Sequence, residues 1–258
     1  MRAIHRSLML AIVLTVSSAG ADDAKAKKSP KRDPKALEIV KQTVDTCKNA
    51  RTLHVAVEVE AHVQNGDEKQ DLHNRCVYDL EKPGRFALRT RAVKDKESGL
   101  DCVTDGKTLF VHSLRLKQYT ESDAPKSLAE LPERLVRFGR SSTGFFVPNL
   151  LADDPYESLV EDLITCSYAG KDKIGDIEAH HVKAVHPELK WELWIAATGK
   201  PLVLKAATLV AVDEIRVTAT ETYGNWKVDE PLEQAAFAIT APANATKVDV
   251  LGQPKKSK

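Results

Sequence analysis

A period of two runs through the longest regular pattern in the chain, which begins at Leu53. Apolar side chains occupy every second position up to Val63, and mostly polar side chains stand between them. This spacing is typical of a β-strand that buries one face. A hairpin turn signal, Asn65-Gly66, follows, and the alternation resumes over residues 71–80. These segments predict a long antiparallel hairpin with one apolar face.

Shorter segments of the same kind continue along the chain between turn signals such as Asp105-Gly106 and Gly175-Asp176. Consecutive strands joined by short turns pair antiparallel, and such a sheet can bury one face while the other meets water. We therefore expect a long antiparallel meander. Its further strands are predicted at residues 85–93, 100–104, 108–112, 116–120, 167–174, 177–186, 191–196, 202–210 and 216–226, with a short edge strand at 237–240.

The period changes from two to that of a helix in residues 34–49. Asp33 is placed to cap this helix, and Pro34 fits its first turn. The apolar side chains fall on one stripe at helical spacing. They are Leu37, Val40, Val44 and Cys47.

An insertion at residues 121–165 interrupts the strands. Helices are predicted over 127–138 and 156–163, with Pro132 expected to break or kink the first. Between them, 144–151 is too rich in apolar residues for a surface loop. A half-open sheet needs an apolar cover, because its bare inner face would be a large exposed patch. This stretch is therefore either a fixed plug or a lid that leaves when a ligand enters. Its lid residues are Phe145, Phe146, Leu150 and Leu151.

The two ends of the chain lack the strand pattern. Residues 1–21 combine a basic start, an apolar run and small residues at 19–21, which together predict a cleavable signal peptide and export to the periplasm. The alternative is an uncleaved anchor, although the apolar run is too short to span a bilayer. Residues 22–33 and 251–258 are charged and are expected to be a flexible leader and a basic flexible tail. The domain is expected at 34–250.

Four cysteines occur in this exported chain, and its compartment permits disulfides. Four cysteines allow three complete pairings, which the sequence does not rank. Cys76 and Cys102 are expected on the apolar inner side together with Cys47, and a disulfide among these three is one hypothesis. The fourth candidate is Cys166. Because no CxxC occurs, neither a thioredoxin motif nor a zinc knuckle is indicated.

Motifs that would indicate catalysis are missing from the sequence. No G-x-S-x-G elbow and no phosphate-binding glycine loop occur. The adjacent His180 and His181 would point to opposite faces of a strand, so one metal ion cannot bind both. Lysine and arginine number 38 against 37 aspartate and glutamate, which leaves no basic footprint for nucleic acid. We expect no catalytic residue, no metal and no cofactor.

Four short motifs resemble one family when they are taken in order. They are Lys82-Pro83-Gly84-Arg85-Phe86, Asp105 to Phe110, Trp194-Ile195 with Gly199 to Leu202, and Ala236 to Pro242, the last being similar to the family's closing strand. The chain resembles periplasmic lipoprotein carriers (LolA-like) over residues 34–250, and within that superfamily it is most similar to predicted periplasmic proteins of unknown function.

This resemblance implies a mainly β fold with helices (α+β). The fold is a curved, unclosed antiparallel sheet with an N-terminal helix and a helical lid insertion on the concave face. In this family the residue before the turn proline is an arginine that helps to latch the lid. Lys82 stands there instead, with the charge but without the planar fork of donors. From the strand alternation, the cavity lining is predicted to include Val55, Val57, Leu72, Tyr78, Phe86 and Leu88.

Taken together, the sequence predicts a periplasmic, non-enzymatic protein that carries or senses a lipid or acylated ligand in an apolar cavity. Burial of an acyl chain contributes about 0.8 kcal/mol per methylene and needs no catalytic group. The alternative is an envelope interaction or stress-sensing module with an envelope protein as its partner. Contact with the membrane is expected to be peripheral or transient only.

Overall fold

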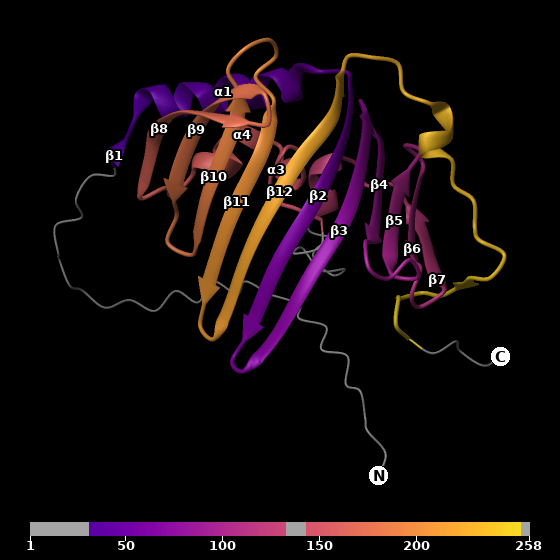
Figure 1. The fold of residues 1–258 in the computed structure, drawn as a ribbon. Helices are drawn as coiled ribbons and strands as arrows, with labels where there is room; N and C mark the ends of the chain where they lie inside the picture. The colour runs from indigo at the N-terminus through magenta and orange to yellow at the C-terminus, as the bar shows by residue number, and fades with distance from the viewer. Residues whose placement is uncertain (1–30, 133–142, 254–258) are drawn as a thin grey trace, which may run out of the picture.

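In the computed structural model, which describes residues 31–132 and 143–253, thirteen strands form one unclosed sheet (Figure 1). The order across the sheet is β1-β8-β9-β10-β11-β12-β2-β3-β4-β5-β6-β7-β13. The strands are β1 (Lys31–Arg32), β2 (Thr52–Asn65), β3 (Glu68–Glu81), β4 (Arg85–Ala92), β5 (Gly99–Thr104), β6 (Thr108–Ser113), β7 (Gln118–Asp123), β8 (Thr165–Ile174), β9 (Ile177–Val185), β10 (Leu189–Ala196), β11 (Val203–Val212), β12 (Ile215–Val228) and β13 (Thr246–Lys247).

Most neighbouring strands pair antiparallel, as the alternation predicted. The expectation of an entirely antiparallel sheet is wrong at its two ends, where β1 pairs parallel with β8 and β13 pairs parallel with β7. These two short strands come from segments that precede and follow the meander, so turn signals gave no sign of them. The two halves of the meander meet in the middle of the sheet, where β12 pairs with β2.

One face of this sheet is apolar because paired residues of neighbouring strands share a face. Val55 of β2 lies opposite Tyr78 of β3, which lies opposite Leu88 of β4. All three are buried in the main core, as are Val57 and Phe86. This inner face is the one that the alternation predicted, and the long β2–β3 hairpin contributes most of its middle (Figure 1).

Helix α1 (Pro34–Asn49) covers the inner face beside β8 and β9. The carboxylate of Asp33 caps it by accepting a hydrogen bond from the Lys35 N–H at 2.9 Å. The predicted stripe packs into the main core, although Leu37 is only partly buried. The buried side of the helix also includes Ala36, Ile39 and Thr43.

A 3-10 turn, η1 (Leu128–Glu130), takes the start of the helix expected at 127–138. Leu131 and Pro132 are helical, and the later part of that helix lies outside the described residues. The second helix of the insertion ends three residues earlier than predicted. The apolar stretch forms a single helical turn, α3 (Phe146–Asn149), followed by α4 (Pro155–Val160). The carboxylate of Asp154 fixes the start of α4 by accepting hydrogen bonds from the N–H groups of Tyr156 and Glu157.

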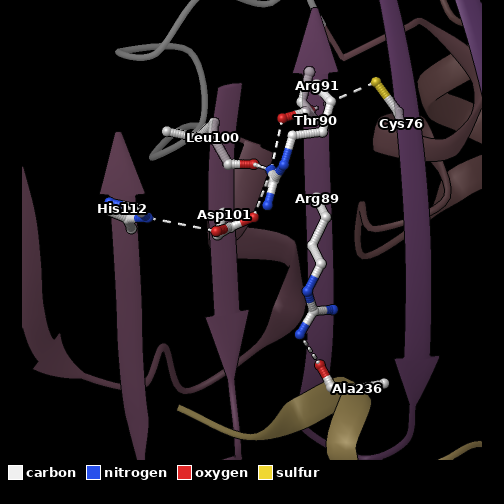
Figure 2. Close-up of polar contacts among 8 residues, drawn as sticks. All are labelled: Cys76, Arg89, Thr90, Arg91, Leu100, Asp101, His112 and Ala236. Carbon is white, nitrogen blue, oxygen red and sulfur yellow. Dashed lines mark hydrogen bonds and ion pairs between the residues drawn. The ribbon is translucent and has the colours of Figure 1, made fainter. Parts of the chain in front are cut away.

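The edge strand predicted at 237–240 is wrong, because the chain there is held by side chains instead of a strand ladder. A 3-10 turn, η3 (Gln234–Phe237), places the Phe237 ring against Ala87 and Val103 on the outer face of β4 and β5. The guanidinium of Arg85 lies 4.2 Å from the centre of that ring. Arg89 donates a hydrogen bond to the Ala236 carbonyl at 2.7 Å (Figure 2). We call residues 232–239 the outer strap.

Residues at both ends of the predicted domain contact the sheet. Residues 31–33 of the expected leader are ordered, since β1 pairs with β8 and the Asp33 N–H donates to the Cys166 carbonyl at 2.8 Å. At the other end, Leu251 packs against the main core and the Gly252 N–H donates to the Gln118 side chain at 2.8 Å. The predicted signal peptide lies outside the described residues. No helix within them is long and apolar enough to cross a bilayer.

Candidate functional site

Residues 143–151 lie over the middle of the inner face, and we call them the inner lid. The side chain of Phe146 is 0% exposed, and its ring stands perpendicular to that of Tyr223 at 6.2 Å between centres. The partly buried Phe145 ring lies 6.3 Å from that of Trp191. The inner lid therefore places both phenylalanines against aromatic residues of the sheet.

A small cavity of about 20 Å³ remains between the inner lid and the sheet. A buried water needs about 10–15 Å³ by this measure, so the space suits about one water molecule. Side chains of the lid, of α1 and of α4 pack in the core on this concave side. The cavity is lined by Leu53, Val55, Tyr78, Leu80, Phe86, Val147, Leu150, Leu151 and Trp226.

The predicted cavity and lid residues divide into those that line this space and those that lie beside it. Val55, Tyr78 and Phe86 line it from the sheet, and Leu150 and Leu151 line it from the lid. The remaining predicted residues do not line it. Val57 and Leu88 are buried on the same face, Leu72 is half-buried further along β3, and Phe145 and Phe146 pack in the lid beside the cavity.

An acidic side chain, Glu221 of β12, lies on the apolar inner face directly beneath the inner lid. It is 2% exposed, and its strand neighbours are Val59 and Ala206. One carboxylate oxygen accepts a hydrogen bond from the Phe145 N–H at 2.7 Å, and the other accepts one from the Tyr223 hydroxyl. A buried polar group has to be hydrogen-bonded to be tolerated, and here the lid backbone supplies part of that requirement.

Two further features join the start of the inner lid to the sheet. The Tyr78 hydroxyl donates a hydrogen bond to the Thr143 carbonyl. Gly144 has a φ of +90°, and a Cβ there would lie 3.1 Å from the Glu221 carboxylate. Only glycine both adopts this backbone conformation readily and leaves room for the carboxylate. At the end of α3, the Asn149 amide donates to the Phe145 carbonyl at 2.7 Å and accepts from Ser158 of α4.

The ionisable groups of this site are shifted towards their neutral forms. Burial raises the pKa of Glu221, although the hydrogen bonds from Tyr223 and from the lid backbone act in the opposite direction. Burial also raises the pKa values of Tyr78 and Tyr223 well above the usual value. Both tyrosines are therefore hydroxyl donors at neutral pH.

Lys82, the position of the family latch, contacts a different element. Its ammonium group donates a hydrogen bond to the Lys48 carbonyl at the end of α1. Partial burial lowers the pKa of Lys82, and the carboxylate of Asp229 opposes that shift. A lysine at this place satisfies a carbonyl group that the helix end leaves without a helical partner. The structure thus places Lys82 at the end of α1 and the inner lid over Glu221.

All four cysteines are buried thiols, and no disulfide joins any of them within the described part of the chain. Burial raises the pKa values of Cys47 and Cys76 to about 12, which keeps them protonated at neutral pH. Cys76 of β3 and Cys102 of β5 share the inner face, but β4 lies between them. Two strand spacings of about 4.8 Å separate their Cα atoms by more than the roughly 7 Å that a disulfide can bridge.

The outer face carries a second group of polar residues, on β4, β5 and β6. Arg91 and Asp101 form an ion pair at 2.7 Å, and the His112 ring lies 3.5 Å from the same carboxylate (Figure 2). These contacts link three neighbouring strands on the side away from the cavity. Within residues 31–132 and 143–253, no three His, Cys, Asp or Glu residues are grouped to hold a metal ion.

Glu221 and Tyr223 were not among the site residues predicted from the sequence, although Glu221 bonds to the lid backbone and Tyr223 bonds to Glu221. A signal for Glu221 was present, because Val217, Ala219 and Tyr223 occupy the apolar phase of the strand predicted at 216–226 and Glu221 falls in that phase. An acid in the buried phase of a strand needs partners, which here come from a segment 76 residues away.

Comparison with known proteins gives a family and several distant structures. No curated protein matches the chain. Lipoprotein LppX from Mycobacterium tuberculosis is 16% identical, covers 78% of this chain and 98% of its own, and has a TM-score of 0.47. A LolA superfamily protein from Nitrosomonas europaea is 13% identical over 79% of this chain and 97% of its own, with a TM-score of 0.35. One chain of the Pseudomonas aeruginosa MucA/MucB complex is 11% identical over 83% of this chain and 63% of its own, with a TM-score of 0.43. A family model described as predicted periplasmic protein (DUF2092) matches residues 36–251, so the chain belongs to this family and the periplasmic location expected from its sequence is confirmed.

Proposed function

We propose that this protein is a periplasmic binding protein, not an enzyme, and that it carries or senses a lipid or acylated ligand between the inner lid and the sheet. One observation carries the proposal. The apolar inner face is covered at its middle by a nine-residue segment with one helical turn, and a cavity lies directly beneath that segment. Such a cover can be exchanged for a ligand, whereas a second packed sheet could not.

The energies of lid and ligand are of the same order. A fully buried Leu, Val or Phe side chain contributes about 1.5–3 kcal/mol, and the lid buries Phe146, Val147 and Leu151. An acyl chain of about twelve carbons would contribute roughly 10 kcal/mol on the same face. An acyl chain can therefore replace the lid side chains without a large net change in buried apolar area.

The chemistry of the inner face also suits binding better than catalysis. Among the described residues, the polar groups beneath the inner lid are Tyr78, Tyr223 and Glu221, each hydrogen-bonded to another of them or to the lid backbone. The cavity walls are otherwise aliphatic and aromatic. Uptake of an apolar chain needs shape and apolar area, which this face supplies, and no group that transfers protons at neutral pH.

The first test is native mass spectrometry of protein purified from the envelope fraction. We expect a co-purifying lipid or acylated molecule bound to the monomer. A stoichiometric protein partner without lipid would instead favour the interaction or stress-sensing module.

The second test is titration with a polarity-sensitive naphthylamine dye. The double variant Phe145→Ala/Phe146→Ala should take up dye more readily than wild type, because the ligand then competes with a weaker cover. Phe110→Ala is the matched control, since Phe110 is buried on the opposite face of the sheet. Unchanged dye uptake together with a large loss of stability would make the two phenylalanines fixed core and would contradict the proposal.

A further inference from the structure

Glu221 is an acid in a place where an acyl-binding cavity needs none. The inner face around it is apolar, and within residues 31–132 and 143–253 it forms no ion pair with a lysine, arginine or histidine. Its partners are hydrogen-bond donors, namely the Phe145 N–H and the Tyr223 hydroxyl. The Glu221 carboxylate can thus accept a hydrogen bond from any donor group that occupies the position of the inner lid.

Opening of the inner lid removes part of this arrangement. When residues 143–146 move away, Glu221 loses the Phe145 N–H, while Tyr223 stays on the same strand. A buried acceptor that loses its donor without a replacement destabilises the open state, and a charged acceptor does so more strongly. A ligand that takes the place of the lid therefore binds best when it brings an N–H group to the same position.

Two tyrosines of the inner face connect the apolar cavity to the surroundings of Glu221. Tyr78 lines the cavity with its ring, and its hydroxyl group reaches the start of the lid at Thr143. On β12, the Tyr223 ring stacks on that of Trp226, which also lines the cavity, with 6.1 Å between ring centres. The cavity, where an acyl tail would lie, and Glu221, where its headgroup would lie, are thus connected through Tyr78 and Tyr223.

Resting on the proposed function, we infer that Glu221 is the headgroup site of this cavity and selects acyl ligands with an uncharged or cationic head that donates an N–H hydrogen bond. The N–H group of an acyl amide can donate to Glu221 the hydrogen bond that the Phe145 N–H donates when the lid is closed. A free fatty acid brings a second carboxyl group next to Glu221 and no N–H group, so it leaves this acceptor unfilled and is repelled wherever both acids are ionised. The cavity therefore prefers acyl amides over fatty acids of equal chain length.

The test is displacement of the naphthylamine dye, at pH 7.5, by two ligands that share a twelve-carbon acyl chain. One is dodecanoate and the other is N-(2-hydroxyethyl)dodecanamide, both below their aggregation concentrations. We expect wild type to bind the amide at least about tenfold more tightly, because each 1.4 kcal/mol of like-charge repulsion is a factor of ten. In Glu221→Gln this preference should fall to within about threefold, since the repelling charge is gone.

Glu60→Gln is the matched control. It makes the same substitution on the outer face of β2, opposite Thr220 of β12, and should keep the wild-type preference. Tyr223→Phe is measured in parallel, so that the result does not depend on the folding of a single variant. It removes one donor from the carboxylate and should widen the preference for the amide.

Each outcome bears on a separate claim. Equal affinity of wild type for the two ligands, or a preference that Glu221→Gln and Tyr223→Phe both leave unchanged, would overturn the headgroup site but leave acyl binding intact. If the dye binds and neither ligand displaces it from folded wild type, acyl binding itself fails, and with it the proposed function.

Discussion

The inner lid and the outer strap lie on opposite faces of the sheet, and the two are attached differently. The inner lid contains Phe146, 0% exposed, and the outer strap contains Phe237, 2% exposed. The backbone of the lid is bonded to buried side chains of the sheet, above all to Glu221. The strap is held by Arg85 and Arg89, whose guanidinium groups are only part-buried or exposed.

The difference lies in what replaces each attachment when it breaks. Water can solvate Arg85 and Arg89 when the strap lifts, so each of these surface contacts adds little to stability. Water cannot serve the inner face in the same way, because exposing it would wet a large apolar surface as well as Glu221. Lifting of the strap therefore does not depend on a replacement ligand. The lid is a cover whose removal is favourable only when another apolar molecule takes its place.

Replacement of each of three buried phenylalanines by alanine should give the largest changes in the free energy of unfolding. The three values compare the sheet with the inner lid and with the outer strap. Phe86→Ala, in the sheet, should lower the free energy of unfolding by about 3–5 kcal/mol. Phe146→Ala should cost less, because its loss is limited to the free energy that separates the closed lid from the open one. Phe237→Ala should destabilise the protein without a change in dye uptake. Urea melts measure all three.

The comparison breaks if Phe146→Ala costs as much as Phe86→Ala while dye uptake stays at the wild-type level. The lid would then unfold only with the whole sheet. A gain in dye uptake by Phe237→Ala would equally contradict the division between the two faces.

The next largest effect should be a pH dependence of stability that comes from Glu221, the residue to which the lid backbone is bonded. Burial raises the pKa of Glu221 in the folded state above the usual value of 4.5, so the folded protein holds this proton where the unfolded chain has lost it. The stability that this group contributes is full below about pH 4.5 and is lost as the pH rises through the raised pKa. Relative to Glu221→Gln, wild type should therefore become less stable from pH 4.5 upwards.

Urea melts of wild type, Glu221→Gln and the control Glu60→Gln between pH 4 and pH 8 measure this difference. Glu60→Gln should follow the wild-type curve. A difference between wild type and Glu221→Gln that is the same at every pH would show that Glu221 titrates as it does in the unfolded chain.

The smallest expected effect concerns the family latch position. Lys82→Ala removes a contact between an ammonium group and the last turn of α1, which contributes about 0.3–1 kcal/mol. Because that contact does not reach the inner lid, dye uptake should stay at the wild-type level, and Lys82→Arg should restore the stability. An increase in dye uptake by Lys82→Ala would instead show that Lys82 helps to hold the inner lid closed.

The parts of the fold that the sequence predicts are those set by local periodicity. The alternation from Leu53 to Val63 fixed β2 and its buried face, and the cap at Asp33 fixed the start of α1. The two-residue strands β1 and β13 were missed because two residues show no period, and they pair with partners more than a hundred residues away.

The site is harder to predict because it joins distant segments. The apolar composition of 144–151 indicated a cover for the inner face, and the structure has one there. Which side chain the lid backbone bonds to depends on the register of β12 against β2, and no local pattern gives that register. Phe237 was predicted to lie in an edge strand. A single apolar residue among small ones is equally typical of an edge strand and of a turn whose side chain packs on a sheet, and the structure has the turn.

The openness of the sheet has a consequence for self-association. A closed barrel has no edges, but closure would also leave the inner face without an entrance. An open sheet keeps that entrance and leaves two edges, where unpaired backbone groups invite strands of other chains. Here β1 covers the edge at β8 and β13 covers the edge at β7, each over only two residues. These end segments therefore shield the first two residues of β8 and of β7 from a neighbouring chain while the sheet stays unclosed.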